Sequence, residues 1–214
     1  MKAVIFANGE FSPPDGLSEI LDETDLIIAA DGGTRHLSKL GHMPDVIVGD
    51  MDSLEEEQRD RMLAAGVEMK IFPTQKDKSD LELAIEHAKD MGAGQVTILA
   101  ALGRRWDHSL VNLLMVAQEE FAEMDIVFLH GVERLFFIRR KADVQAEIGT
   151  RLSLIPIGAD ASGVRTQGLA YPLNNETLTF GSSRGISNVF AEENASIELE
   201  DGHLLCVISP HDYN

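Results

Sequence analysis

The sequence predicts an α/β N-terminal domain followed by an all-β C-terminal sandwich domain. Up to about residue 131, short apolar runs alternate with helical patterns, which is typical of an open, mainly parallel sheet in Rossmann-like layers with right-handed crossovers. Beyond Gly131 helical periodicity disappears, and short β-rich runs follow between Gly, Asn, Asp and Pro residues. We therefore predict two domains, residues 1–131 and 132–214.

In the N-terminal part, the capping boxes Ser53/Glu56 and Ser79/Glu82 mark the starts of two helices. These helices are expected to end near residues 65 and 91, and two more are expected at about 33–40 and 107–121. The stretch around Pro13 and Pro14 is expected to form turns. The expected strands are 3–7, 26–30, 46–48, 68–72, 95–100 and 126–130.

In the C-terminal part, short runs of apolar and β-branched residues predict antiparallel strands. The Asp201–Gly202 pair is a hairpin-turn signal between the last two of them. The expected strands are 135–138, 152–157, 178–180, 196–199 and 204–208.

The composition and charge limit the classes of partner. A net charge of -18 argues against a nucleic-acid or anionic-membrane surface, since both would be repelled. The single cysteine, Cys206, excludes an internal disulfide framework and a cysteine-based zinc site. The N-terminal apolar stretch is too short for a signal peptide, and no run approaches the ~18 apolar residues of a membrane span. We expect a cytoplasmic protein.

Acidic residues follow several of the expected strands in tight groups. Because ligands of an open parallel sheet bind beyond the carboxyl ends of its strands, these groups should converge on one rim. Clustered carboxylates repel one another unless a cation lies among them, and hard oxygen ligands suit Mg²⁺, which usually arrives with phosphate. The pattern predicts Mg-dependent phosphate chemistry. The residues are Asp31, Asp50, Asp52, Asp77, Asp80 and Asp107.

Each motif also has a plain structural interpretation. Asp77 and Asp80 suit a helix N-terminus through the helix dipole alone, and Lys76 is either a solvent-exposed charge or a phosphate contact. Gly32 and Gly33 allow a close approach of the backbone to phosphate, but they also suit an ordinary turn. The sequence Gly181–Gly185 matches a nucleophile elbow, which we reject because it lacks the required strand-to-helix turn.

The segment G-R-R-W-D-H supplies cations that an acidic phosphate site needs. Arg104 and Arg105 follow an expected strand, and arginine binds phosphate in a bidentate manner. The plain alternatives are that Asp107 caps its helix and that His108 packs against the protein. Since neither a Walker A sequence nor G-x-G-x-x-G occurs in the chain, any nucleotide is held in another way.

Taken together, the motifs resemble those of the thiamine pyrophosphokinase family. The segments A-D-G-G-T-R-H-L, V-I-V-G-D-M-D-S, P-T-Q-K-D-K-S-D, A-L-G-R-R-W-D-H and G-I-S-N occur in the family's order and span nearly the whole chain. The resemblance implies transfer of pyrophosphate from ATP to the hydroxyl of thiamine, giving thiamine diphosphate and AMP. It also implies Mg²⁺ dependence and a homodimer with active sites between subunits.

The resemblance also implies roles for single residues. Asp50, Asp52 and Asp80 would hold Mg²⁺, with Asp77 beside them, and Asp107 would lie near the attacking hydroxyl. The ATP side would be formed by Asp31, Gly32, Gly33, Arg104, Arg105 and His108. Thiamine would be approached by Lys76, Ser187 and Asn188.

Two other functions remain open at this point. One is a Mg-dependent phosphohydrolase with an aspartyl nucleophile, because Asp50-x-Asp52 resembles a D-x-D motif. The other is a non-catalytic nucleotide-binding module, which would bind ATP and metal without releasing AMP. The products formed from ATP and thiamine distinguish all three.

Overall fold

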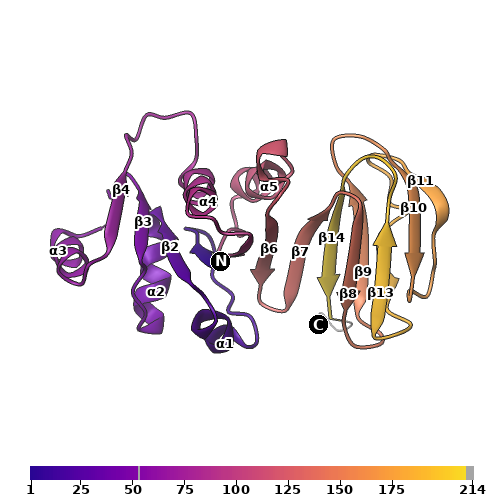
Figure 1. Cartoon of the computed structure of the whole chain (residues 1–214), viewed down its shortest axis with the longest axis horizontal. Coiled ribbons are helices and arrows are strands. Elements are labelled where there is room, and N and C mark those ends of the chain that lie inside the picture. Colours follow the sequence, from indigo (N-terminus) through magenta and orange to yellow (C-terminus); the bar gives the residue numbers. More distant parts are fainter. Residues whose placement is uncertain (53, 211–214) are drawn as a thin grey trace. The chain divides into compact units, whose positions relative to one another are not determined.

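The computed structural model describes residues 1–52 and 54–210. The chain forms two compact units, Met1–Gly131 and Val132–Asn214 (Figure 1). An α/β unit followed by an all-β unit confirms the predicted fold class. Unit 1 contains β1 (Lys2–Phe6), α1 (Leu17–Asp22), β2 (Leu26–Ala30), η1 (Asp31–Gly33), α2 (Thr34–Leu40), β3 (Val46–Gly49), α3 (Glu56–Ala64), β4 (Glu68–Ile71), α4 (Asp80–Asp90), β5 (Gln95–Leu99), α5 (Trp106–Met115), η2 (Glu119–Phe121) and β6 (Asp125–His130).

Six strands of unit 1 form a parallel sheet in the order β6-β5-β1-β2-β3-β4. The chain adds β2, β3 and β4 on one side of β1 and then returns to place β5 and β6 on the other. The strand order therefore reverses beside β1, and ligands of open α/β sheets bind at such a switch point.

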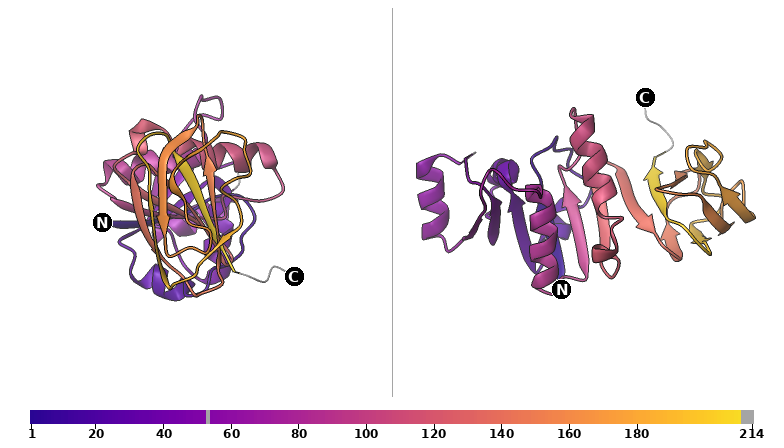
Figure 2. Two further views of the ribbon diagram at one scale, coloured as in Figure 1. Left: turned by 90° about the vertical axis from the view of Figure 1, so that its right-hand side faces the viewer. Right: turned by 90° about the horizontal axis from the view of Figure 1, so that it is seen from above.

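Helices cover the sheet because its central strands are apolar on both faces. Ile5, Phe6, Ile28 and Ile47 are completely inaccessible to solvent, as expected for a buried parallel sheet. Helix α2 packs on β1 and β2, while α4 packs on β1, β2 and β3 and contacts α5. Figure 2 shows α4 and α5 next to each other on one side of the strands.

Helices α2, α4 and α5 of unit 1 start within one residue of their predicted positions, whereas α3 starts later than predicted. Ser79 caps α4, with its hydroxyl accepting a hydrogen bond from the Glu82 amide. Helix α3 has Glu55 as its N-cap, so the predicted start was too early, and Ser53 lies outside the described residues. Helix α5 ends at Met115, and η2 follows. Helix α1 follows the stretch around Pro13 and Pro14 and was not predicted from the sequence.

Unit 2 is a sandwich of two antiparallel sheets, ordered β12-β9-β14-β7 and β11-β10-β13-β8. Alternate residues of both sheets point inward and share one apolar core, which includes Leu152, Val164, Ile197 and Cys206. The strands are β7 (Glu133–Ile138), β8 (Lys141–Gln145), β9 (Arg151–Pro156), β10 (Ala161–Gln167), β11 (Asn174–Leu178), β12 (Asn188–Val189), β13 (Asn194–Glu198) and β14 (Leu204–Ser209).

Several strand predictions for unit 2 were wrong. Strands β8 and β10 were missed because they carry many polar residues, and β11 ends where the predicted strand 178–180 begins. Asp201–Gly202 is not a hairpin turn: β13 pairs with β8 and β10, whereas β14 pairs with β7 and β9. The turn therefore carries the chain from one sheet to the other. Among the residues described in both units, no helix is long and apolar enough to cross a membrane.

Candidate active site

The ends of β2 and β3 bring three carboxylates together. Asp31 directly follows β2, while Asp50 and Asp52 follow β3. Met51, between them, adopts a left-handed conformation with φ of 64° and buries its side chain in the core. This uncommon geometry for a non-glycine residue keeps Asp50 and Asp52 outside the core on either side of a buried residue.

The three carboxylates form a cluster that could hold a cation. One oxygen from each of Asp31, Asp50 and Asp52 lies within 4.8 Å of the other two. The Asp52 amide donates to Asp50 Oδ1 at 3.2 Å, and Asn8 Nδ2 donates to Asp31 Oδ2 at 2.6 Å. Asp31 Oδ1 is buried without a hydrogen-bond partner among residues 1–52 and 54–210.

Electrostatic repulsion is visible in the pKa values of this cluster. The pKa of Asp52 is raised, chiefly by the charge of Asp50, with Asp31 and Asp80 acting in the same direction. The pKa of Asp50 is lowered, first by the hydrogen bond from the Asp52 amide and also by Thr74. The cluster thus concentrates negative charge that a divalent cation would neutralise.

The residues fit Mg²⁺ in ligand chemistry. One oxygen of each carboxylate lies within 4.8 Å of the other two, so the three groups converge where they would hold a single cation. Carboxylate oxygens are the ligands that Mg²⁺ prefers. The buried Asp31 Oδ1 is an acceptor whose partner the cation would supply.

A pocket of about 680 Å³ opens at the carboxyl ends of the strands of unit 1. This volume lies within the range of small-molecule sites. Glu10, Asp31, Asp50 and Asp80 contribute acidic groups to its lining, and five basic side chains also line it. The basic residues are Arg35, Lys76, Lys78, Arg104 and Arg105. In a chain of net charge -18, this local concentration of basic side chains suits a polyphosphate.

Asp80, which the sequence predicts as a metal ligand, is paired with a lysine in the structure. Its Oδ1 pairs with Lys76 Nζ at 2.7 Å, and both side chains are largely buried. The group of carboxylates whose oxygens lie within 4.8 Å of one another contains Asp31 where the sequence suggested Asp80. Asp80 still affects the charge of Asp52, so its role as a ligand stays a prediction.

Arg105 and His108 line the pocket, whereas Asp107 is outside the lining formed by the described residues. Arg105 donates two hydrogen bonds to Asp107, at 2.6 and 3.3 Å, on an exposed surface. These bonds hold the pKa of Asp107 below its usual value, which makes this carboxylate a weaker base. Asp77 is exposed and, among the described residues, lies outside the pocket lining.

The glycine pair serves close packing in this structure. A Cβ on Gly33 would lie 1.9 Å from the backbone oxygen of Phe6, and one on Gly32 would lie 2.4 Å from Asn8 Oδ1. Both glycines are buried in η1. They therefore let the loop after β2 approach β1 and the loop that follows it, while their predicted contact with ATP stays a prediction.

Ser187 and Asn188 lie in unit 2 and differ in environment. Ser187 is exposed and has a left-handed conformation with φ of 59°, a strain that often marks functional positions. Asn188 is buried, and its amide exchanges hydrogen bonds with the backbone of Tyr171 at 2.7 and 3.0 Å. Its side chain holds the loop before β11 to β12, and its contact with thiamine stays a prediction.

The structure adds pocket residues that were not predicted from the sequence. Asn8 and Glu10 come from the loop after β1, Arg35 from α2 and Asn112 from α5. Asn8 follows a strand as the predicted aspartates do, and Asn112 lies one turn after His108. The strand-end rule applied to the aspartates would have found Asn8 if neutral polar side chains had been included, but it would not have found Asn112, which lies inside α5.

Comparisons with known proteins agree with this geometry. The family model described as the thiamin pyrophosphokinase catalytic domain matches residues 17–128, and the model of the thiamin pyrophosphokinase vitamin B1 binding domain matches residues 138–204. The chain is 29% identical over 212 residues to thiamine pyrophosphokinase of Bacillus subtilis, covering 98% of this chain and 99% of that one. It is 30% identical over 179 residues to thiamine pyrophosphokinase 2 of Arabidopsis thaliana, covering 78% and 66%.

Solved structures show the same architecture. The crystal structure of thiamine pyrophosphokinase from Bacillus subtilis matches with a TM-score of 0.87 at 28% identity, over 98% of this chain and 99% of that one. The structure from Geobacillus thermodenitrificans matches with a TM-score of 0.85 at 26% identity, over 100% and 99%. Because the catalytic-domain model alone matches more than half of the sequence, the chain belongs to the thiamine pyrophosphokinase family.

Proposed function

We propose that the pocket of unit 1 is where this enzyme transfers pyrophosphate from ATP to the hydroxyl of thiamine, releasing AMP. The observation that carries this assignment is the carboxylate cluster of Asp31, Asp50 and Asp52 beside a pocket lined with basic side chains. Transfer of a phosphoryl group depends mainly on alignment and on neutralising charge at the phosphate oxygens. The basic side chains would align the phosphate groups, and the carboxylate cluster would hold a cation that neutralises their charge.

The metal-binding part of the proposal rests on Asp50 and Asp52, with Asp31 as the third ligand and Asp80 nearby. When bound, Mg²⁺ neutralises charge on the phosphate oxygens of the transferred group. The Asp52 amide and Thr74 hold Asp50 through hydrogen bonds, so this ligand is oriented before any cation arrives. A preoriented ligand lowers the cost of binding.

The nucleotide part rests on the basic residues of the lining. Arg104 and Arg105 lie in the loop between β5 and α5, and Arg35 lies on α2, which follows β2. The three side chains therefore reach the pocket from the ends of two different strands. Lys76 neutralises Asp80 in the structure. We propose that Lys76 exchanges this partner for a phosphate oxygen when ATP binds.

The test is a product assay with ATP, Mg²⁺ and thiamine. AMP and thiamine diphosphate should form together, and neither should form when thiamine or the divalent cation is omitted. Release of ADP or inorganic phosphate as the main product would replace the proposal with a kinase or a phosphohydrolase. Binding of ATP without turnover would indicate the non-catalytic module, while the family relationship favours the transferase.

We further propose that the enzyme works as a homodimer, with Ser187 and Asn188 of the partner subunit closing the thiamine site. Support comes from α5, whose inner residues His108 and Asn112 line the pocket. The same helix exposes apolar side chains that a second subunit would cover. They are Trp106, Leu110, Val111 and Leu114, which are 44% to 75% exposed. A cytoplasmic location stays a prediction.

A further inference from the structure

Asn8 connects the loop after β1 to the carboxylate cluster. Its Nδ2 donates to Asp31 Oδ2 at 2.6 Å, and the donor assignment is chemically fixed because an ionised carboxylate accepts but does not donate. The backbone oxygen of Asn8 in turn accepts a hydrogen bond from Arg35 Nη2 at 2.8 Å. A short chain of hydrogen bonds thus runs from α2 through Asn8 to Asp31.

Asp31 is held in an uncommon conformation at this point. Its φ of 47° lies in the left-handed region, which costs free energy for a residue with a side chain and persists only where neighbours enforce it. One of its oxygens is taken by Asn8, while Oδ1 is buried and has no hydrogen-bond partner among the described residues. A buried acceptor without a partner is costly unless a cation or donor completes it.

Gly32 makes the contact between Asn8 and Asp31 sterically possible. A Cβ at residue 32 would lie 2.4 Å from Asn8 Oδ1, 2.7 Å from its Cγ and 2.9 Å from its Nδ2. All three distances are shorter than real contacts of a Cβ atom. The Asn8 amide therefore occupies the space that a side chain at residue 32 would fill.

We propose that Asn8 is a positioning residue for metal binding, because its amide engages Asp31 Oδ2 and thereby presents Oδ1 to the cation. This inference rests on the proposed function, since it requires Asp31 to be a ligand of the divalent cation. Residues that hydrogen-bond to metal ligands restrict the orientation of those ligands and raise metal affinity. Asn8 contacts the ligand residue Asp31 and does not itself bind the metal.

The test is a titration of the protein with Mn²⁺ alone, without ATP or thiamine, following free Mn²⁺ by electron paramagnetic resonance. Asn8→Ala should weaken Mn²⁺ binding by about tenfold or more, the scale typical of such second partners. Asn112→Ala is the matched control, because Asn112 also lines the pocket but donates to the backbone oxygen of Ala101. Its Mn²⁺ affinity should stay within about twofold of the unmodified protein.

A double-mutant cycle separates positioning from a general effect on the fold. If Asn8 acts through Asp31, adding Asn8→Ala to an Asp31→Asn protein should change Mn²⁺ affinity by less than about twofold. Additive losses would overturn the proposal. Gly32→Ala provides a second test, because the added Cβ would displace the Asn8 amide. This variant should also weaken Mn²⁺ binding. Its unfolding temperature is measured separately to detect a general effect on the fold.

The outcomes distinguish this inference from the metal assignment on which it depends. If Asp31→Asn weakens Mn²⁺ binding but Asn8→Ala does not, the metal site stands and Asn8 has no positioning role. If Asp31→Asn leaves Mn²⁺ affinity unchanged, Asp31 is not a ligand and both statements fall. In the complete reaction, Asn8→Ala should raise the KM for Mg²⁺ much more than it lowers kcat at saturating Mg²⁺.

Discussion

Replacing Asp52 with asparagine separates the activity of this enzyme from its stability. Asp52→Asn keeps the shape of the side chain and removes one negative charge from the carboxylate cluster. The charge of Asp50 raises the pKa of Asp52, as do those of Asp31 and Asp80, so ionised Asp52 is repelled by its neighbours. Its removal should leave the unfolding temperature equal to or higher than that of the unmodified protein.

The expected loss of activity follows from the geometry of the cluster. Asp52 supplies one of three carboxylate oxygens that lie within 4.8 Å of one another, and an amide oxygen carries no compensating charge. We expect turnover to fall by at least about a hundredfold, the scale found when one preorganised electrostatic group is removed from an active site. The group is exposed, so this loss arises from the site and not from the core.

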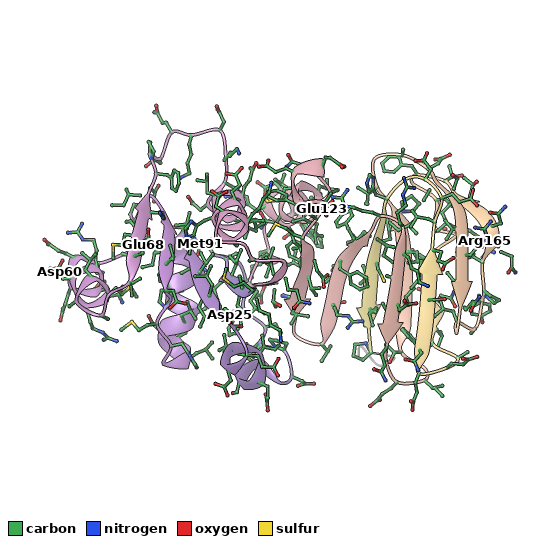
Figure 3. The ribbon with its side chains drawn as sticks, in the orientation of Figure 1. Asp25, Asp60, Glu68, Met91, Glu123 and Arg165 are labelled. Carbon is green, nitrogen blue, oxygen red and sulfur yellow. The ribbon has the colours of Figure 1, made fainter. Side chains whose placement is uncertain are left out.

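The assay measures AMP and thiamine diphosphate by chromatography at saturating ATP, thiamine and Mg²⁺, beside a thermal unfolding curve. Asp60→Asn is the control, because it makes the same change in net charge on α3 (Figure 3). That variant should retain full activity. An Asp52→Asn protein with more than about a tenth of the original turnover, or one that unfolds at a clearly lower temperature, would refute the reasoning.

Three further results are expected. Gly33→Ala should lower the free energy of unfolding by about 1–3 kcal/mol or more, because its Cβ would lie 1.9 Å from the backbone oxygen of Phe6; chemical denaturation measures this loss. Cys206 should resist a thiol reagent at pH 8 in the native protein, since burial raises the pKa of its thiol to about 12; an absorbance assay follows the reaction. Mixing inactive Asp52→Asn and Ser187→Arg proteins should restore part of the activity, because one site of each mixed dimer is intact.

Each of these experiments has its own control. Gly94→Ala should leave stability nearly unchanged, because no described atom lies within 4 Å of the added Cβ. The thiol must react once the protein is unfolded, and rapid reaction in the folded state would contradict the burial argument. In the mixing experiment, demonstrated mixed dimers without activity would reject a site shared between subunits.

The sequence by itself determined the fold class and the rim on which the site lies. In a parallel sheet the carboxyl ends of the strands meet at one edge, so aspartates that follow apolar runs identify that edge without knowledge of packing. The buried runs of unit 1 are distinctive because both faces are covered. Polar strands carry a weaker hydrophobic pattern in the sequence. In β8, for example, only Val144 is buried among the five residues.

The tertiary structure decided which side chains meet on that rim. The left-handed conformation of Met51 and the hydrogen bond from Asn8 to Asp31 depend on neighbouring loops that are distant in sequence, and no local pattern encodes them. Lys76 takes Asp80 as its partner, while Asp31 joins Asp50 and Asp52. Strand ends can be located from local periodicity, but distances between side chains are set by the packing of loops that only the folded chain brings together.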